Sequence, residues 1–94
     1  MSGERIKVGQ IVKSHAGHDA GWIYVVVGTP TSLMVLVANG RDRSVSKPKK
    51  KNIRHISVLN CLDKGVAAKV TSDNRVTDED IRAAINAWIG TGEQ

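Results

Sequence analysis

Apolar positions in the first half of the chain fall into short runs separated by turn residues. Three of these runs favour strands because they are rich in valine and isoleucine or apolar throughout. They cover residues 9–14, which are entered through a glycine turn, residues 22–27 and residues 33–38. The dipeptide Asn39-Gly40 comes next and is typical of a two-residue hairpin turn. We therefore expect a fourth strand over residues 41–46 and a fifth over residues 53–58. Five short strands joined by tight turns predict a small, strongly bent antiparallel barrel, because closure hides the sheet edges.

In the second half, apolar positions recur every three to four residues, which is the period of a helix. Residues 59–70 predict a helix that Gly65 weakens. Farther on, Thr77 and Asp80 stand at capping-box positions, and Gly90 stands where a glycine ends many helices. One apolar face lies between them and consists of Ile81, Ala84, Ile85, Trp88 and Ile89. This pattern predicts an amphipathic helix.

These elements predict one mainly β domain in a chain of 94 residues. The five-stranded barrel would take residues 1–58, and one or two C-terminal helices packed on it would form an extension of the same domain over residues 59–94. We expect the last helix to cover the strand face of Trp22, Tyr24 and Val26, opposite the face of Ile23, Val25 and Val27.

Positive charge is concentrated in the predicted barrel, and the net charge of the chain is +5. Residues 1–58 carry ten lysines and arginines against three acids, whereas residues 59–94 carry four against six. Seven of the ten barrel cations fall within residues 41–54. A basic segment beside a slightly acidic tail is typical of a domain that binds nucleic acid.

The densest positive charge is the lysine run of residues 47–52, which holds four lysines and Pro48. Repulsion between like charges and the missing proline amide predict an irregular loop. One interpretation is an arm that follows phosphates and releases counterions on binding. The other is a solvated loop that keeps the protein soluble. In both cases we expect these lysines to contribute little to folding, because exposed charges stabilise a fold only weakly.

Residues that suggest catalysis or metal binding are present but badly spaced. Ser14, His15 and Asp19 are the residue types of a hydrolytic triad, yet they lie too close together on one predicted loop to align. His15, His18 and Cys61 do not complete a set of metal ligands. With no nucleotide-binding motif either, we expect no enzyme activity and no cofactor. The lone cysteine excludes an internal disulfide, and no apolar run is long enough for a membrane span, so we expect a cytoplasmic protein.

The segment of residues 10–27 resembles a KOW motif, which runs strand, glycine loop, strand. Gly17 matches the central glycine of that motif and Gly21 its second glycine, and both are expected to need positive φ or a close backbone approach. Beyond the motif, residues 36–43, 47–51 and 53–56 are similar to the fourteen-e family of large-subunit ribosomal proteins, and closer still to small bacterial KOW-domain proteins that resemble it. The resemblance implies an SH3-like barrel, RNA binding and association with the ribosome. Many KOW loops are basic on both sides of the second glycine, where this chain has Ala20 and Trp22, so the lysine run would supply more of the attraction.

The leading hypothesis is a non-catalytic RNA-binding protein, monomeric and not bound to a membrane, whose partner is ribosomal RNA, the ribosome or ribosomal proteins. Arg41 and Arg43 would grip phosphate from one side of the hairpin, and Trp22 would either stack on a base or be covered by the C-terminal helix. The alternatives are an SH3-like protein-interaction module of the transcription or translation machinery, and a purely structural subunit. The candidate RNA-binding residues are Lys13, His15, Gly17, His18, Gly21, Trp22, Arg41, Arg43, Lys47, Lys49, Lys50, Lys51 and Arg54.

Overall fold

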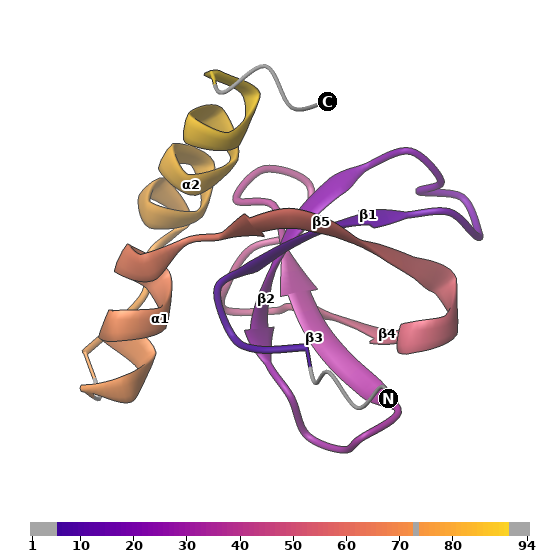
Figure 1. Cartoon of the computed structure of the whole chain (residues 1–94), viewed down its shortest axis with the longest axis horizontal. Coiled ribbons are helices and arrows are strands. Elements are labelled where there is room, and N and C mark those ends of the chain that lie inside the picture. The colour runs from indigo at the N-terminus through magenta and orange to yellow at the C-terminus, as the bar shows by residue number, and fades with distance from the viewer. Residues whose placement is uncertain (1–5, 73, 91–94) are drawn as a thin grey trace.

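Five antiparallel strands and two helices make up the protein, as a computed structural model that describes residues 6–72 and 74–90 shows (Figure 1). The predicted domain limits therefore include ten residues outside the described part, namely 1–5, 73 and 91–94. In chain order the elements are β1 (Gln10–Ser14), β2 (Ile23–Gly28), β3 (Met34–Ala38), β4 (Lys49–Asn52), the 3₁₀ turn η1 (Ile53–His55), β5 (Ile56–Leu62), α1 (Lys64–Thr71) and α2 (Asp78–Gly90). The predicted mainly β fold with C-terminal helices is confirmed.

The sheet is barrel-like but not closed. Its strand order is β4-β3-β2-β1-β5, so among the described strands β4 and β5 form the two edges and are joined only through η1. An irregularity between β1 and β5 helps the sheet to bend, because Gln10 pairs with Leu62 whereas Val12 pairs with Val58. The Gln10 side-chain amide donates hydrogen bonds to the Leu59 and Cys61 carbonyls at this place, which satisfies backbone groups that the bulge takes out of the ladder.

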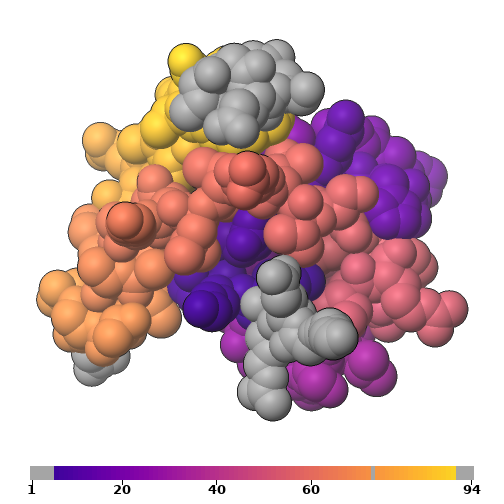
Figure 2. Space-filling model, in the orientation of Figure 1, coloured from indigo at the N-terminus to yellow at the C-terminus, as the bar shows by residue number. Residues whose placement is uncertain are grey.

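Two apolar clusters lie on opposite sides of the central strands. The first is enclosed by the curled sheet and contains Val12, Tyr24, Val26, Val35, Val37 and Ile56. The second lies between the sheet and the helices and contains Ile11, Val25, Val66, Ile81, Ala84 and Trp88. In the space-filling view the helices, in orange and yellow, lie along one side of the sheet (Figure 2). None of the described helices is long and apolar enough to cross a membrane.

Helix α2 therefore covers the face of β2 opposite to the one that we expected. Ile23 and Val27 pack with the helix cluster, whereas Tyr24 and Val26 point into the barrel. Both faces of β2 are apolar, so alternation along this strand did not distinguish the inside of the barrel from the face under the helices.

The predicted start of α2 is confirmed in detail. The Thr77 amide donates to Asp80 Oδ2 at 2.9 Å, and the Asp80 amide donates to Thr77 Oγ1 at 3.2 Å. Ile81, Ala84 and Trp88 are buried as the apolar face requires, whereas Ile89 at the end of that face is 46% exposed. Gly90 is itself helical, whereas we expected it just beyond the helix.

The expected strand over residues 41–46 is absent. Asn39 turns the chain instead, because its side-chain oxygen accepts from the Arg41 and Arg43 amides at 3.0 and 2.9 Å. The loop that follows is fastened to α2 by Asp78, which accepts from the Ser44 hydroxyl and the Val45 amide at 2.9 and 2.8 Å. A contact between residues more than thirty positions apart thus replaces the hairpin that the local sequence favoured.

The fourth strand lies in the lysine run, where we expected an irregular loop. β4 pairs with β3 through Val35–Lys51, Leu36–Lys50 and Val37–Lys49. Downstream, residues 53–55 form η1, and β5 continues to Leu62, through the first residues of the predicted helix. Helix α1 then begins at Lys64, where the Asp63 carboxylate caps the Val66 amide at 2.9 Å.

Candidate nucleic-acid interface

Residues 15–21, the glycine loop, connect β1 to β2 and turn sharply at two glycines. Gly17 has φ of +86° and Gly21 has φ of +94°, which confirms the predicted positive φ. The loop is closed by the Gly21 amide donating to the Ser14 carbonyl at 2.7 Å and the Ser14 amide donating to the Trp22 carbonyl at 2.9 Å. This path turns the Asp19 carboxylate inward while both glycines stay exposed at the surface.

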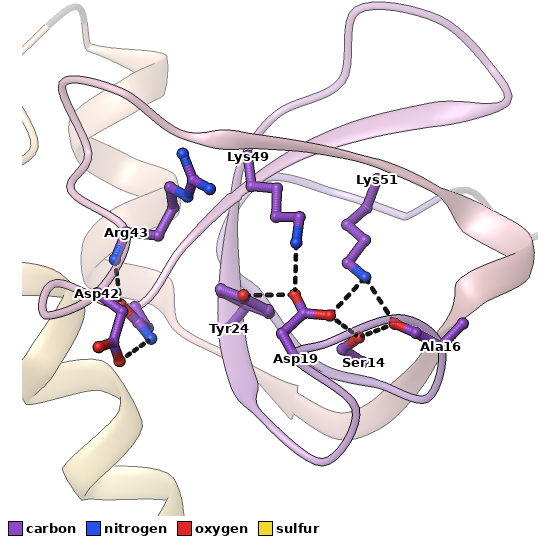
Figure 3. A network of polar contacts seen from close by, with 9 residues as sticks. Ser14, Ala16, Asp19, Tyr24, Asp42, Arg43, Lys49 and Lys51 are labelled. Atoms are coloured by element: carbon purple, nitrogen blue, oxygen red, sulfur yellow. Dashed lines mark hydrogen bonds and ion pairs between the residues drawn. The ribbon is translucent and has the colours of Figure 1, made fainter.

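A buried carboxylate fastens the glycine loop to β4 (Figure 3). Asp19 is 2% exposed and accepts four side-chain hydrogen bonds, an arrangement that we call the Asp19 cluster. The donors are the hydroxyls of Ser14 at 2.9 Å and Tyr24 at 2.6 Å, and the ammonium groups of Lys51 at 2.8 Å and Lys49 at 3.2 Å. Lys51 also donates to the Ala16 carbonyl at 3.0 Å, so it holds the loop backbone as well as the carboxylate.

Electrostatics keep this cluster charged. Burial acts to raise the pKa of Asp19, but the bonds from Lys51, Tyr24, Ser14 and Lys49 outweigh it and hold the pKa well below its ordinary value. Burial and the adjacent carboxylate raise the pKa of Tyr24. At neutral pH the cluster therefore contains one negative and two positive charges, and Tyr24 stays a neutral donor.

The three residues of hydrolytic-triad type, Ser14, His15 and Asp19, are not aligned as a triad. Ser14 is buried and bonds Asp19 directly, whereas the His15 side chain is exposed and so does not stand between them. Within residues 6–72 and 74–90, no three His, Cys, Asp or Glu side chains gather as a metal site would need.

The lysines of β4 divide between two sides of the strand. Lys51 is 7% exposed and the Lys49 side chain is 32% exposed, and both point toward Asp19 on the face of Val35 and Val37. Lys50 lies between them in sequence, points outward beside Leu36 and is exposed. The expectation of one solvated lysine loop is therefore wrong, because the alternation of a strand sends neighbouring side chains to opposite faces.

Most of the other candidate residues are at the surface. Arg43 is half-buried, and Arg41 and Arg43 sit in the Asn39 turn, not side by side on a strand as we expected. The exposed cationic and imidazole side chains among the candidates are Lys13, His15, His18, Arg41, Lys47, Lys50 and Arg54.

Trp22 and Tyr24 have different surroundings. Trp22 is 41% exposed beside the glycine loop and is not covered by α2. Tyr24 is 1% exposed, and its ring is tilted 48° to that of Trp22 with 6.3 Å between the centroids. Only Trp22 of this pair has an accessible ring face.

Two residues of this surface were not predicted in their roles, namely Asp19, which fastens the glycine loop, and Arg75, an exposed cation beyond α1. One signal was available for Asp19, since it is the only Asp, Glu, Lys or Arg in residues 14–40. A single acid in a loop of a basic domain has many lysines available as partners. No comparable signal marks Arg75.

The chain resembles a curated protein over most of its length. No family model matches the chain. The chain is similar to a Bacillus subtilis (strain 168) protein named "Putative ribosome-binding protein YbzG", with 34% identity over 71 residues. The match covers 76% of this chain and 96% of that protein.

Proposed function

The chain belongs to the same family as the Bacillus subtilis protein YbzG, and from that premise we propose that it is a non-catalytic RNA-binding protein that associates with the ribosome in the cytoplasm. The name of the relative supports association with the ribosome. The surface charge of this chain supports RNA as the contacted component. Ribosomal RNA is the proposed target and a monomer is the proposed binding form.

The observation that carries the RNA proposal is the distribution of ion pairs. The described residues form three ion pairs, which use Asp19 with Lys49, Asp19 with Lys51, and Asp80 with Lys69. Asp78, a further acid near the basic segment, accepts from Ser44 and Val45. No ion pair within the described residues neutralises the exposed cations Lys13, Arg41, Lys47, Lys50 and Arg54. Unpaired surface cations of this number attract a polyanion.

The glycine loop supports the same proposal. Gly17, His18 and Trp22 are exposed together around a turn whose backbone is held rigidly by the Asp19 cluster. A backbone without side chains at Gly17 and Gly21 allows close approach of a ribose-phosphate chain, and Trp22 offers a face for an unstacked base. We assign the loop to the KOW type on the strength of its resemblance and its two positive-φ glycines.

One observation favours the protein-interaction alternative. A pocket of about 520 Å³ is lined by Ile6, Val35, Ile53 and Val58 together with hydroxyl residues of the β2–β3 connection. Val58 is 53% exposed, and Leu33, which lies between the lining residue Ser32 and the start of β3, is 58% exposed. Apolar surface of this kind fits a protein side chain better than RNA.

Salt dependence of binding separates the two functions. The affinity of purified protein for ribosomal RNA fragments would be measured from 50 to 300 mM salt, with Lys47→Ala/Lys50→Ala and, as a matched control, Lys7→Ala/Lys64→Ala. We expect a steep salt slope that flattens by up to ~2 units in the first variant, because each lysine that neutralises a phosphate contributes about one unit. The control should keep the wild-type slope. Binding to ribosomes that is insensitive to salt and to both variants would overturn the RNA proposal in favour of a protein contact.

A further inference from the structure

A second pocket, of about 380 Å³, lies between the outer face of the sheet and the connection from α1 to α2. This size falls in the range of about 300–1,000 Å³ that small ligands occupy. Six apolar residues from five parts of the fold form its walls, namely Val27, Leu36, Val45, Pro48, Val70 and Val76. Val70 is 39% exposed, so the pocket is open to solvent.

One exposed cation lines this pocket, and two more exposed cations neighbour its lining residues. Arg75 lines it directly, Lys47 lies between the lining residues Ser46 and Pro48, and Lys50 is the register partner of the lining residue Leu36 on the same outer face. Within residues 6–72 and 74–90, no ion pair neutralises any of the three. Asp78, the carboxylate that bonds the lining residue Val45, already accepts from that amide and from the Ser44 hydroxyl.

Apolar walls with cations beside them suit a ligand that has an apolar group next to an anionic group. An unpaired nucleotide has this character, because its base has two apolar faces and its phosphates lie on either side along the chain. The 520 Å³ pocket gives the contrast, since no Lys, Arg, Asp or Glu is among its described lining residues, whereas Arg75 lines the 380 Å³ pocket. The 520 Å³ pocket therefore suits a protein side chain, whereas the cations beside the 380 Å³ pocket favour an anionic chain there.

We propose that the pocket between β3, residues 45–48 and the α1–α2 connection receives one unpaired base of a bound RNA, with the adjacent phosphates on Lys47, Lys50 and Arg75. This inference rests on the proposed RNA-binding function and adds a preference to it. A base in a duplex is stacked and paired and does not reach the pocket, so the protein prefers RNA with a bulged or single-stranded nucleotide. Without an aromatic side chain among the described pocket walls, contact is by apolar surface, and the identity of the base matters little.

Binding to three matched RNAs tests the site. The probes are a duplex, the same duplex with one bulged nucleotide, and that bulge made abasic, all at one salt concentration. We expect wild-type protein to bind the bulged RNA about tenfold tighter than the other two, as burial of a base's apolar surface implies. Ser46→Phe places a ring in the pocket without changing charge and should abolish the preference, whereas Ser57→Phe, at an exposed position on β5 that does not line the pocket, should keep it.

The possible results separate this inference from the function on which it rests. Equal binding of all three RNAs by wild-type protein would overturn the base site and leave RNA binding intact. Failure to bind any of them would overturn the proposed function itself. If Ser46→Phe weakens association with ribosomes while the bulge preference persists, the pocket takes a protein side chain and the base site is wrong. If Ser46→Phe does not fold, the abasic comparison with wild-type protein and with Trp22→Ala decides the question: loss of the bulge preference in Trp22→Ala would place the base on the exposed Trp22 ring and overturn the pocket site.

Discussion

Lysines on the two sides of β4 differ in burial and in ion pairing. On the inner side, Lys49 and Lys51 meet Asp19 in the mouth of the barrel. On the outer side, Lys50 faces solvent. Lys47, in the turn before the strand, is exposed too, and no ion pair of the described residues involves either lysine. We call these the inner lysines and the outer lysines. The difference teaches that a run of lysines in a sequence is not equivalent to a cationic surface, because the pleat and one distant carboxylate decide which charges reach solvent.

The inner lysines act on structure. A buried ion pair does not by itself make a fold more stable than an apolar replacement would, because desolvation offsets the attraction. Removing one member is costly, however, since the others stay buried without compensation. The Asp19 cluster therefore fixes where the glycine loop sits on β4. The outer lysines form no ion pair within the described residues, so their ammonium groups are available to bind phosphate.

The largest expected effect comes from removing the carboxylate that defines the inner side. Asp19→Asn keeps the shape but leaves Lys51 and Lys49 without a counter-charge, and we expect a loss of about 3–5 kcal/mol in the free energy of unfolding. Urea denaturation measures it, with Asp42→Asn as an exposed control that should change by less than about 0.5 kcal/mol. Equal stability of the two variants would show that the cluster does not fasten the loop.

The same carboxylate predicts acid sensitivity. The pKa of Asp19 is lowered in the folded state from an ordinary value of 3.8, so its contribution is complete above that value and is lost as pH falls through the lower folded pKa. Asp78 and Asp80 also have lowered pKa values and add to the loss. We expect wild-type stability to fall below about pH 4, and Asp19→Asn to show a flatter acid limb. Parallel limbs for the two proteins would contradict this assignment.

A paired substitution compares the inner and outer sides directly. Lys51→Met should cost about 1–3 kcal/mol, because Asp19 and the Ala16 carbonyl lose a buried donor, and it should leave the salt slope of RNA binding unchanged. Lys50→Met should leave the melting temperature nearly unchanged and flatten that slope by up to ~1 unit. If Lys51→Met alone flattened the slope, the inner lysines would have to reach RNA.

Tyr24 gives a smaller effect at the alkaline end. Its pKa is raised above the ordinary 10.0, so its neutral form stabilises the fold below pH 10 and the contribution is lost as pH rises through the folded pKa. We expect Tyr24→Phe to cost about 1–2 kcal/mol at pH 7 and to be less sensitive than wild type to pH above 10. Thermal unfolding from pH 7 to 11 checks both points. A variant with the same alkaline limb as wild type would show that another group causes it.

Short-range patterns in the sequence determined several features correctly. The valine-rich runs gave β2 and β3, the spacing of Gly17 and Gly21 gave the positive-φ loop, and Thr77 with Asp80 gave the start of α2. Each depends on residues within a few positions of one another, so the chemistry that decides it is visible in a short window. The concentration of cations in residues 41–54 likewise marked the segment that supplies both outer lysines.

Only the tertiary structure decided the rest. β4 forms in the lysine run because Asp19, thirty and thirty-two residues earlier, neutralises Lys49 and Lys51 and removes the repulsion that predicted a loop. The Asn39 turn does not lead into a strand because Asp78 on α2 holds the chain that follows. The helices cover Val25 rather than Val26 although both are fully apolar, since the curl of the sheet chooses which face becomes the inside. In each case a distant partner or the curvature of the whole sheet outweighs a local preference, and neither is present in any short stretch of the sequence.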